Sequence, residues 1–266
     1  MIPPLLLVGC GRMGSAMLAG WRERGLAASF AVDPAPDAAR NGGADLTVVS
    51  DLSSVPAGFD PAAVILAVKP QSAAEAVPAY ARFAGSAVFL SIMAGRTIGG
   101  IRTLLGGSAA IVRAMPNTPA AVRQGITVAT PNAAVTAGQR SLCETLLRAI
   151  GLVEWVEQEE LLDPVTAVSG SGPAYVFLLA ELMEQAAIEQ GIAPDLARVL
   201  ARQTVAGSGA LLAASAESAA DLRRAVTSPA GTTEAALKVL MAPDAMPKAL
   251  SEAVAAATRR SRELAG

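Results

Sequence analysis

The chain has 266 residues, of which 52% are apolar and 17% charged, and its formal net charge is -2. This composition is typical of a folded globular protein with room for two domains, and the weak charge predicts neither nucleic acid nor an anionic membrane as a partner. The sequence contains no histidine, which excludes Ser-His-Asp catalysis, a His-paired cysteine nucleophile and the common zinc sites, and we expect no metal site.

The sequence predicts neither a membrane-spanning helix nor a signal peptide. The most apolar helical segment, residues 173–187, is interrupted by Glu181 and Glu184, so we expect no membrane span. The run "MIPPLLLVGCGRMG" has no basic start and no A-x-A cleavage site, which favours a cytoplasmic protein over a secreted one. Cys10 and Cys143 lie far apart without metal-type or redox-type spacing, and we expect both to be reduced.

In chain order, short apolar runs first alternate with helical patterns and then give way to helices alone. Helix-length segments such as "MGSAMLAGWRERG" and "QSAAEAVPAYARFA" separate most of the runs, which indicates βαβ units around a mainly parallel sheet. The predicted strands cover residues 3–8, 29–33, 46–49, 62–68, 86–92, 109–115, 125–130 and 151–156.

After about residue 160 the pattern predicts only helices, broken at Gly191, at residues 228–231 and at Pro243. We therefore predict an α/β fold: a Rossmann-type, doubly wound, mainly parallel sheet over residues 1–160, followed by an all-helical domain over residues 161–266. The helical part has few aromatic residues, so its own core would be thin, and a helical dimer interface would resolve that weakness.

Three glycines follow the first predicted strand at the spacing of a dinucleotide-binding turn. In such a turn Gly9 makes the bend, Gly11 lets the backbone approach the pyrophosphate, and Gly14 lets helix and strand pack closely. Asp33 ends the second strand, where a carboxylate can accept from the adenosine ribose; the alternative is a turn aspartate before Pro34. The first interpretation favours NADH, although Arg40 and Ser50 leave NADPH open.

Ligands of open α/β sheets bind at the carboxyl ends of the strands, so the residues after the fourth, fifth and sixth strands are candidates for the nicotinamide half. Lys69 could equally be a solvated lysine, and Asn117 a turn residue between prolines. The candidates are Ala67, Val68, Lys69, Pro70, Met93, Ala94, Gly95 and Asn117.

Two turns of the helical half pose a choice between capping and binding. In "VSGSGPAYVF", Ser171 is a predicted N-cap, while Gly170 and Gly172 would let a flat group approach. In "TSPAGTTEAAL", a helix begins at residues 231–233, so its free N–H groups and hydroxyls form a candidate carboxylate site. Glu234 is one residue too early for a capping box with Thr232, which leaves the capping explanation incomplete.

Taken together, the chain resembles the pyrroline-5-carboxylate reductase family over essentially its whole length. The segments that carry the resemblance are "GCGRMGSAMLAG", "AVKPQ", "RAMPNTPA", "GITVAT", "AVSGSGPAYVF" and "VTSPAGTTEAAL", the last being the most specific. The resemblance implies a homodimer through the helical domain, or a ring of dimers, and cofactor contacts from the loop after the glycines, including Arg12 and Met13. It also implies that Ser228, Gly231, Thr232 and Thr233 hold the carboxylate and the ring nitrogen of the substrate.

The implied reaction is reduction of the C=N bond of 1-pyrroline-5-carboxylate to L-proline with NADPH or NADH, and Thr233 is the residue expected to act at the ring nitrogen. Two positions depart from the family pattern: Ala230 replaces a common glycine, and Asp33 argues against the usual NADPH preference. The alternatives are a reductase of another small imine or 2-keto or hydroxy acid, with Lys238 as a candidate helix lysine, and a dinucleotide-binding module without enzymatic activity.

Overall fold

The computed structural model describes residues 1–265, which form two compact units. The first unit comprises Met1–Gly170 together with the chain from Ala257 to its described C-terminal end, and the second comprises Ser171–Ala256. The division at residues 160/161 stays a prediction. The boundary between the two compact units lies ten residues later, after Gly170. The segment before Gly170 belongs to the first unit because it is hydrogen-bonded to Arg113 and Asn117, at β6 and just after it.

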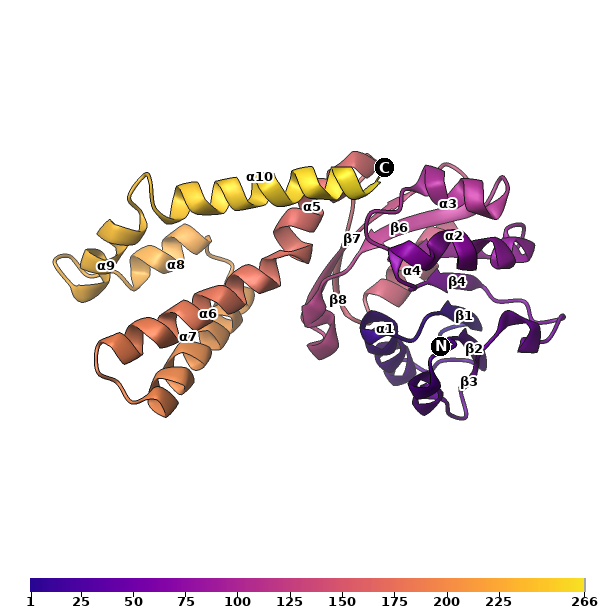
Figure 1. Ribbon diagram of the computed structural model, residues 1–266, viewed down its shortest axis with the longest axis horizontal. Coiled ribbons are helices and arrows are strands. Elements are labelled where there is room, and N and C mark those ends of the chain that lie inside the picture. The colour runs from indigo at the N-terminus through magenta and orange to yellow at the C-terminus, as the bar shows by residue number, and fades with distance from the viewer. Residues whose placement is uncertain (266) are drawn as a thin grey trace. The chain divides into compact units, whose positions relative to one another are not determined.

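The first unit is built on one eight-stranded sheet (Figure 1) with the order β3-β2-β1-β4-β5-β6-β7-β8. Every predicted strand is present, and all neighbours are parallel except β6 and β7. The predicted mainly parallel, doubly wound sheet is therefore confirmed. The strands are β1 (Leu5–Val8), β2 (Ser29–Val32), β3 (Leu46–Val49), β4 (Ala63–Leu66), β5 (Val88–Ser91), β6 (Ala110–Met115), β7 (Gly125–Pro131) and β8 (Gly151–Trp155).

Both faces of the sheet are buried by helices, as the uninterrupted apolar runs of the strands require. Leu5 and Leu7 of β1 point into a core shared with α1 (Arg12–Glu23) and α4 (Ala137–Leu147). Leu6 and Val8 point into a second core, which is shared with α2 (Ala73–Ala76), the 3₁₀ helix Val77–Phe83 and α3 (Ile98–Leu105). This two-sided burial fixes the strands, and because β1 to β6 run parallel, their carboxyl ends lie along one edge of the sheet.

The segment after β4 is less regular than the predicted helix. Residues 70–83 form two stretches of 3₁₀ helix around the single turn of α2. Pro78 explains the change, because it lacks the N–H group that would continue an α-helical hydrogen-bond ladder.

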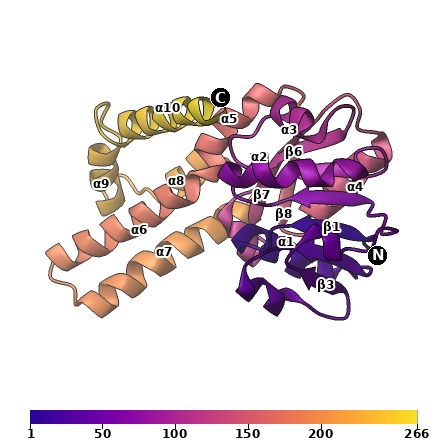
Figure 2. The ribbon, with the colours of Figure 1, turned by 45° about the vertical axis from the view of Figure 1, so that its right-hand side comes forward.

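Within the described chain after residue 160 there are helices and no strands, as predicted. Helices α6 and α7 lie side by side as a hairpin (Figure 2), and the turn between them contains Gly191 at φ 85°. The predicted breaks at residues 228–231 and at Pro243 separate α8 from α9 and α9 from α10, whereas the break at residues 215–218, between α7 and α8, was not predicted. The helices are α5 (Leu162–Val165), α6 (Gly172–Glu189), α7 (Pro194–Ala214), α8 (Ala219–Ala225), α9 (Thr232–Leu240) and α10 (Met246–Ala265).

The second unit has almost no core of its own. Its only fully buried residues are Ala197 and Ala201, both on α7, whereas Phe177 of α6 is 67% exposed. Large apolar side chains are exposed along every helix of the unit except α8, for example Leu182, Leu200, Leu211, Val239 and Leu250. So large an exposed apolar surface marks an interaction site.

One helical run, residues 159–189, is long and apolar enough to cross a membrane by length and composition, even though it contains Glu181 and Glu184. Glu181 and Glu184 therefore do not by themselves exclude a membrane-spanning helix. Exposed large apolar side chains also occur on α7, α9 and α10, as expected where helices pack against a further partner.

Candidate active site

The turn after β1 has the geometry that a dinucleotide site needs. Gly9 has φ 96°, and a Cβ there would lie 2.8 Å from the carbonyl oxygen of Ala67. A Cβ on Gly14 would lie 2.4 Å from the carbonyl oxygen of Gly9, whereas one on Gly11 would meet nothing within 4 Å. The first and third glycines are thus required by packing, and the second leaves open space for a ligand, as expected for this motif.

Helix α1 begins at this turn without a side-chain cap. Gly11 is its N-cap residue, and the first turn contains no acidic side chain. The unpaired N–H groups and the positive end of the helix dipole therefore face the open space beside Gly11, an arrangement that fits a pyrophosphate group. Arg12 is exposed at the start of the helix, whereas Met13 is packed partly against the core.

A hollow of about 420 Å³ adjoins the glycine turn and contains Asp33. One carboxylate oxygen of Asp33 accepts the N–H of Cys10 at 2.6 Å, and the other accepts the N–H of Ala35 at 2.9 Å. The two bonds hold the carboxylate at the mouth of the turn, where a ribose would lie next to the pyrophosphate. The hollow is lined by Cys10, Gly11, Ser15, Asp33, Ala35, Asp37, Ala38, Arg40 and Asn41.

The charges of this hollow bear on the choice between the two nicotinamide cofactors. Arg40 forms an ion pair with Asp37, with 2.9 Å between the guanidinium nitrogen and the carboxylate oxygen. Asp33 and Asp37 together outweigh the one positive charge of Arg40. Ser50, the other residue considered as a phosphate contact, does not line the hollow.

The strand ends predicted to receive the nicotinamide half are held together at one edge of the sheet. Ala67 lies against Gly9, and the guanidinium of Arg96 donates to the carbonyl of Pro70 at 2.9 Å, joining the loops after β4 and β5. Lys69 is exposed, and Met93 is buried in the core. Met93 can therefore meet a ligand chiefly through its backbone.

Asn117 has a structural role that its position between prolines did not reveal. Its side-chain nitrogen donates to the carbonyl of Ser169 at 3.1 Å, and its oxygen accepts the N–H of Ile126 at 3.0 Å. Ser169 belongs to a π-helical turn, Thr166–Gly170, in which the wider winding leaves carbonyl groups available. Asn117 thus ties the end of β6 to the start of the long helical segment, and a role for it in cofactor binding stays a prediction.

The two glycines of "VSGSGPAYVF" differ in their surroundings. A Cβ on Gly170 would lie 3.0 Å from the terminal methyl of Met115, whereas one on Gly172 would meet nothing within 4 Å. Ser171 is the N-cap residue of α6, as predicted, but its hydroxyl does not cap the helix. A side chain at Gly170 would thus require the Met115 side chain to shift, whereas the space beside Gly172 is open.

The threonine turn of the second unit starts α9 without a cap. Gly231 is the N-cap residue and offers no side chain, and no hydrogen bond of the Ser228, Thr232 or Thr233 hydroxyls occurs within residues 1–265. Instead Glu234 accepts the N–H of Ala230, one residue before the N-cap residue, at 2.5 Å. The N–H groups at the start of α9 and the neighbouring hydroxyls remain available for an anionic ligand.

Ala230, which replaces a glycine of the family signature, adopts a left-handed conformation with φ 55°. Alanine is strained there, because its Cβ approaches the following carbonyl oxygen. The turn therefore keeps the glycine-type conformation even though the side chain has changed.

Several residues of these sites were not predicted. Ser15 lines the hollow and donates to the carbonyl of Cys10 at 2.7 Å, Asp37 pairs with Arg40, and Arg96 joins two strand-end loops. Each of these residues follows a predicted motif by only a few positions, and this closeness in sequence is the one feature that could have indicated its place in the site. Across the described residues, no group of three or more acidic or cysteine side chains is placed to hold a metal ion.

Comparisons with known proteins identify both parts of the chain. A family model for pyrroline-5-carboxylate reductase dimerisation matches residues 159–264, and one for coenzyme F420-dependent NADP oxidoreductases matches residues 5–95. Pyrroline-5-carboxylate reductase of Pseudomonas aeruginosa is 37% identical over 99% of this chain and 97% of its own length.

Solved structures agree over the full length. The pyrroline-5-carboxylate reductase of Coxiella burnetii superimposes with a TM-score of 0.91 at 32% identity and covers 100% of both chains. The Plasmodium falciparum enzyme, solved with NADP bound, superimposes with a TM-score of 0.82 at 26% identity, covering 99% of this chain and 100% of its own. The chain is a member of the pyrroline-5-carboxylate reductase family.

Proposed function

We propose that this protein reduces the C=N bond of 1-pyrroline-5-carboxylate to give L-proline, with NADH or NADPH as the reductant. Family membership at 37% identity over nearly the whole chain supports the reaction. The local observation that carries the substrate assignment is the start of α9, where an uncapped helix N-terminus is surrounded by three hydroxyl side chains. A small carboxylate completes such a helix end, because it supplies the missing acceptor.

The substrate carboxylate would bind at Gly231 and Thr232, with the hydroxyl of Ser228 as a further donor. These residues are exposed or half-buried, so they are accessible to a ligand. A carboxylate is favoured here by the N–H groups and by the helix dipole, which contributes roughly 0.3–1 kcal/mol near an exposed helix end.

The hydroxyl of Thr233 would hold the ring nitrogen of the substrate. Thr233 is half-buried in the first turn of α9, one residue along from the proposed carboxylate ligands. The missing histidine is compatible with this chemistry, since a cyclic imine can take its proton from solvent before reduction. The residues of the chain then have to orient the iminium and balance its charges.

The nicotinamide cofactor, when bound, supplies the hydride. The turn of Gly9, Gly11 and Gly14 and the start of α1 fit its pyrophosphate, and the hollow beside Asp33 fits its adenosine ribose. We propose that NADH is the better substrate, because a 2′-phosphate would face the carboxylates of Asp33 and Asp37 while Arg40 is already paired.

The protein would act as a homo-oligomer through its helical unit, which is the part matched by the dimerisation model. The scarcity of buried residues there supports a second copy as the partner that covers α6 and α7. A groove of about 1110 Å³ between these helices is lined by apolar side chains such as Phe177 and Ile188 and by charged ones such as Glu181 and Arg202. Assembly into a ring of dimers and a cytoplasmic location are parts of the same proposal.

The test is a comparison of substrates with the purified protein. Consumption of NADH and of NADPH would be followed with pyrroline-5-carboxylate, with a six-membered cyclic imine carboxylate and with a set of 2-keto acids. We expect the highest kcat/KM for pyrroline-5-carboxylate and formation of L-proline in equal amount to the cofactor consumed. A higher kcat/KM for a keto acid would replace the proposed substrate, and cofactor binding without turnover of any compound would indicate a binding module.

A further inference from the structure

The loop after β5 is fixed from several sides, and one of these contacts comes from the far end of the sequence. This loop, residues 93–97, contains Met93, Ala94 and Gly95, which the proposed function places at the cofactor. Within the first unit, the end of α10 lies against Gly95: a Cβ there would lie 3.1 Å from the carbonyl oxygen of Leu264. Gly95 has φ 70° and lacks a Cβ, so it both permits this approach and leaves the loop intrinsically flexible.

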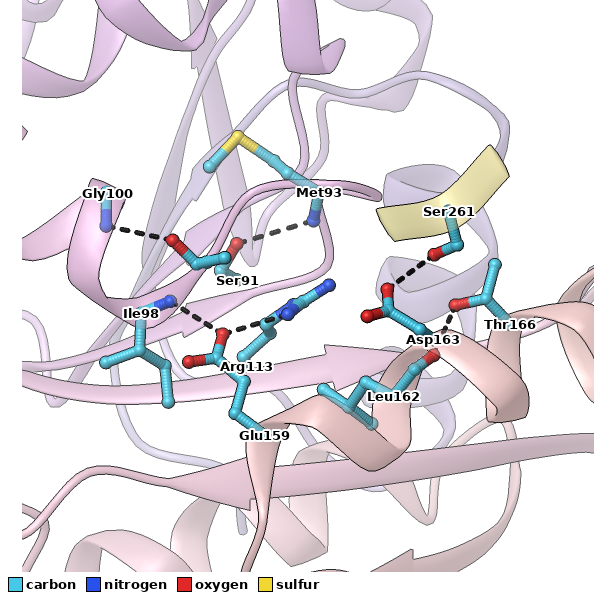
Figure 3. A network of polar contacts seen from close by, with 11 residues as sticks. Ser91, Met93, Ile98, Gly100, Arg113, Glu159, Leu162, Asp163, Thr166 and Ser261 are labelled. Carbon is cyan, nitrogen blue, oxygen red and sulfur yellow. Dashed lines mark hydrogen bonds and ion pairs between the residues drawn. The ribbon is translucent and has the colours of Figure 1, made fainter. Parts of the chain in front are cut away.

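The other side of the loop is anchored by a partly buried ion pair (Figure 3). Glu159 accepts the N–H of Ile98, the first residue of α3, at 2.8 Å and pairs with the guanidinium of Arg113 at 2.9 Å. Arg113 lies on β6 and is 5% exposed. This contact fixes the point where the loop enters α3.

Asp163 follows Glu159 by four residues: Glu159 begins a 3₁₀ turn, Glu159–Leu161, that continues directly into α5, where Asp163 lies. Its carboxylate accepts the hydroxyl of Ser261 at 2.7 Å, and both residues are more than 90% buried. Figure 3 shows the two contacts next to each other, with Asp163 directed toward the α10 segment that carries Ser261. The segment that carries Glu159 and Asp163 therefore anchors the loop in two ways. Glu159 binds the residue that follows the loop, and Asp163 holds α10, whose end lies against Gly95.

We infer that Ser261 is a positioning residue for cofactor binding: by donating to Asp163 it holds the last turns of α10 against Gly95 and so fixes the loop of residues 93–97. The inference rests on the proposed function in that this loop receives the cofactor. Without the bond, the end of α10 loses a buried attachment 98 residues away in sequence, and the glycine loop can sample other conformations.

The test is the affinity of the full-length protein for NADH and NADPH, measured by nucleotide fluorescence or calorimetry, together with steady-state kinetics. We expect Ser261→Ala to raise the cofactor Kd and KM by about 3- to 10-fold, the effect of losing roughly one net hydrogen bond. The KM for pyrroline-5-carboxylate should change less than about twofold, because the threonine turn belongs to the other unit.

Two variants serve as matched controls. Asp163→Asn keeps an oxygen that can accept from Ser261 and should retain cofactor binding. Ser251→Ala removes an exposed serine from the same helix and should behave as the native protein. Ser261→Cys, with a weak donor of similar size, should lie between the native protein and Ser261→Ala, and it carries the test if the alanine variant does not fold.

The outcomes separate the two proposals. If Ser261→Ala lowers the melting temperature but leaves the cofactor Kd and KM unchanged, the positioning role is overturned and Ser261 has a purely structural role. If only Ser261→Cys folds, unchanged cofactor Kd and KM for that variant lead to the same conclusion. A native protein that binds NADH but reduces no imine would refute the proposed function, while weaker binding by Ser261→Ala would still support the positioning role.

Discussion

The carboxylate of Asp33 accepts a hydrogen bond from the backbone N–H of Cys10, with 2.6 Å between the two atoms. The end of β2 is thereby joined to the glycine turn after β1, and a negative charge is fixed within the hollow that would receive the adenosine ribose. This position is where a Rossmann-type site distinguishes a ribose hydroxyl from a phosphate.

Replacing Asp33 by Ser should reverse the cofactor preference. We expect kcat/KM with NADH to fall about 10- to 100-fold, as for loss of hydrogen bonds to a charged acceptor. With NADPH it should rise, because a like charge is removed. Asp60→Ser is the matched control, since Asp60 is exposed and also precedes a proline. A native preference for NADPH would contradict the role given to Asp33.

Asp37 should act on the same preference through Arg40. In Asp37→Asn the guanidinium loses its ion-pair partner and becomes available to a 2′-phosphate. We expect kcat/KM with NADPH to rise about 2- to 10-fold, with little change for NADH. The double variant Asp37→Asn, Arg40→Ala should lose this gain, and a gain that persists would show that Arg40 is not the group responsible.

Thr233→Ala tests the proposed contact with the ring nitrogen. Activity should fall by roughly 10- to 1000-fold while the protein stays folded, as expected for loss of one positioned polar group. Thr233→Ser keeps the hydroxyl and should recover most of the rate. Thr145→Ala, which removes an exposed threonine on α4, is the control. Full activity in Thr233→Ala would remove this residue from the mechanism.

The exposed face of α6 should be essential for assembly. A charge in the middle of an apolar interface is strongly unfavourable, so Phe177→Glu should shift the protein toward monomers and lower its melting temperature. Size-exclusion chromatography with light scattering gives the mass. Leu152→Glu is the control: Leu152 of β8 is 66% exposed, like Phe177 at 67%, but lies in the other unit. An unchanged mass for Phe177→Glu would place the interface elsewhere.

Ala230→Gly should stabilise the protein by about 0.5–1 kcal/mol, because glycine adopts φ 55° without the strain of a Cβ. Ala193→Gly is the opposite case. Ala193 precedes α7 with φ -57°, where alanine is not strained, so this substitution should lower the stability of the protein. Thermal or urea unfolding at a fixed protein concentration measures both. Equal effects of the two substitutions would contradict the strain at Ala230.

Cys10 should react slowly with alkylating reagents at neutral pH. Burial, together with the neighbouring Asp33 carboxylate, raises the pKa of Cys10 to about 11, so very little thiolate is present at pH 8. The alkylation rate of a Cys143→Ser variant should rise about tenfold per pH unit from pH 8 toward pH 10 and be reduced by bound cofactor. A rate that levels off near pH 8.5 would indicate an ordinary, exposed thiol.

The sheet was predictable because its signals are local. Each strand is an apolar run bounded by glycine, proline or polar residues, and all eight were found near their predicted limits. The antiparallel pairing of β6 and β7 was not predicted, since strand direction depends on how the connecting segment crosses the sheet. The irregular segment around Pro78 was not predicted, because the apolar spacing of residues 71–84 is that of a helix although Pro78 interrupts the hydrogen bonds.

The candidate site was predictable to the extent that it depends on motifs. The glycine turn has the expected packing, and α9 begins at the predicted turn. The amide contacts of Asn117 and the bond between Ser261 and Asp163 could not be predicted. Both join segments distant in sequence, and a side chain's partner across such a distance is decided by tertiary packing, for which one sequence has no local pattern.

The first unit is discontinuous in sequence, because the chain returns to it at Ala257, within helix α10, after the other helices of the second unit. During synthesis on the ribosome the residues from Ala257 onward emerge only after the whole helical unit has been made. The nucleotide-binding unit therefore cannot reach its complete native structure while its own sheet is the only part synthesised. A fragment that ends at Gly170 would lack Ser261 as well as the backbone that lies against Gly95, and would be an incomplete substitute for the unit within the full chain.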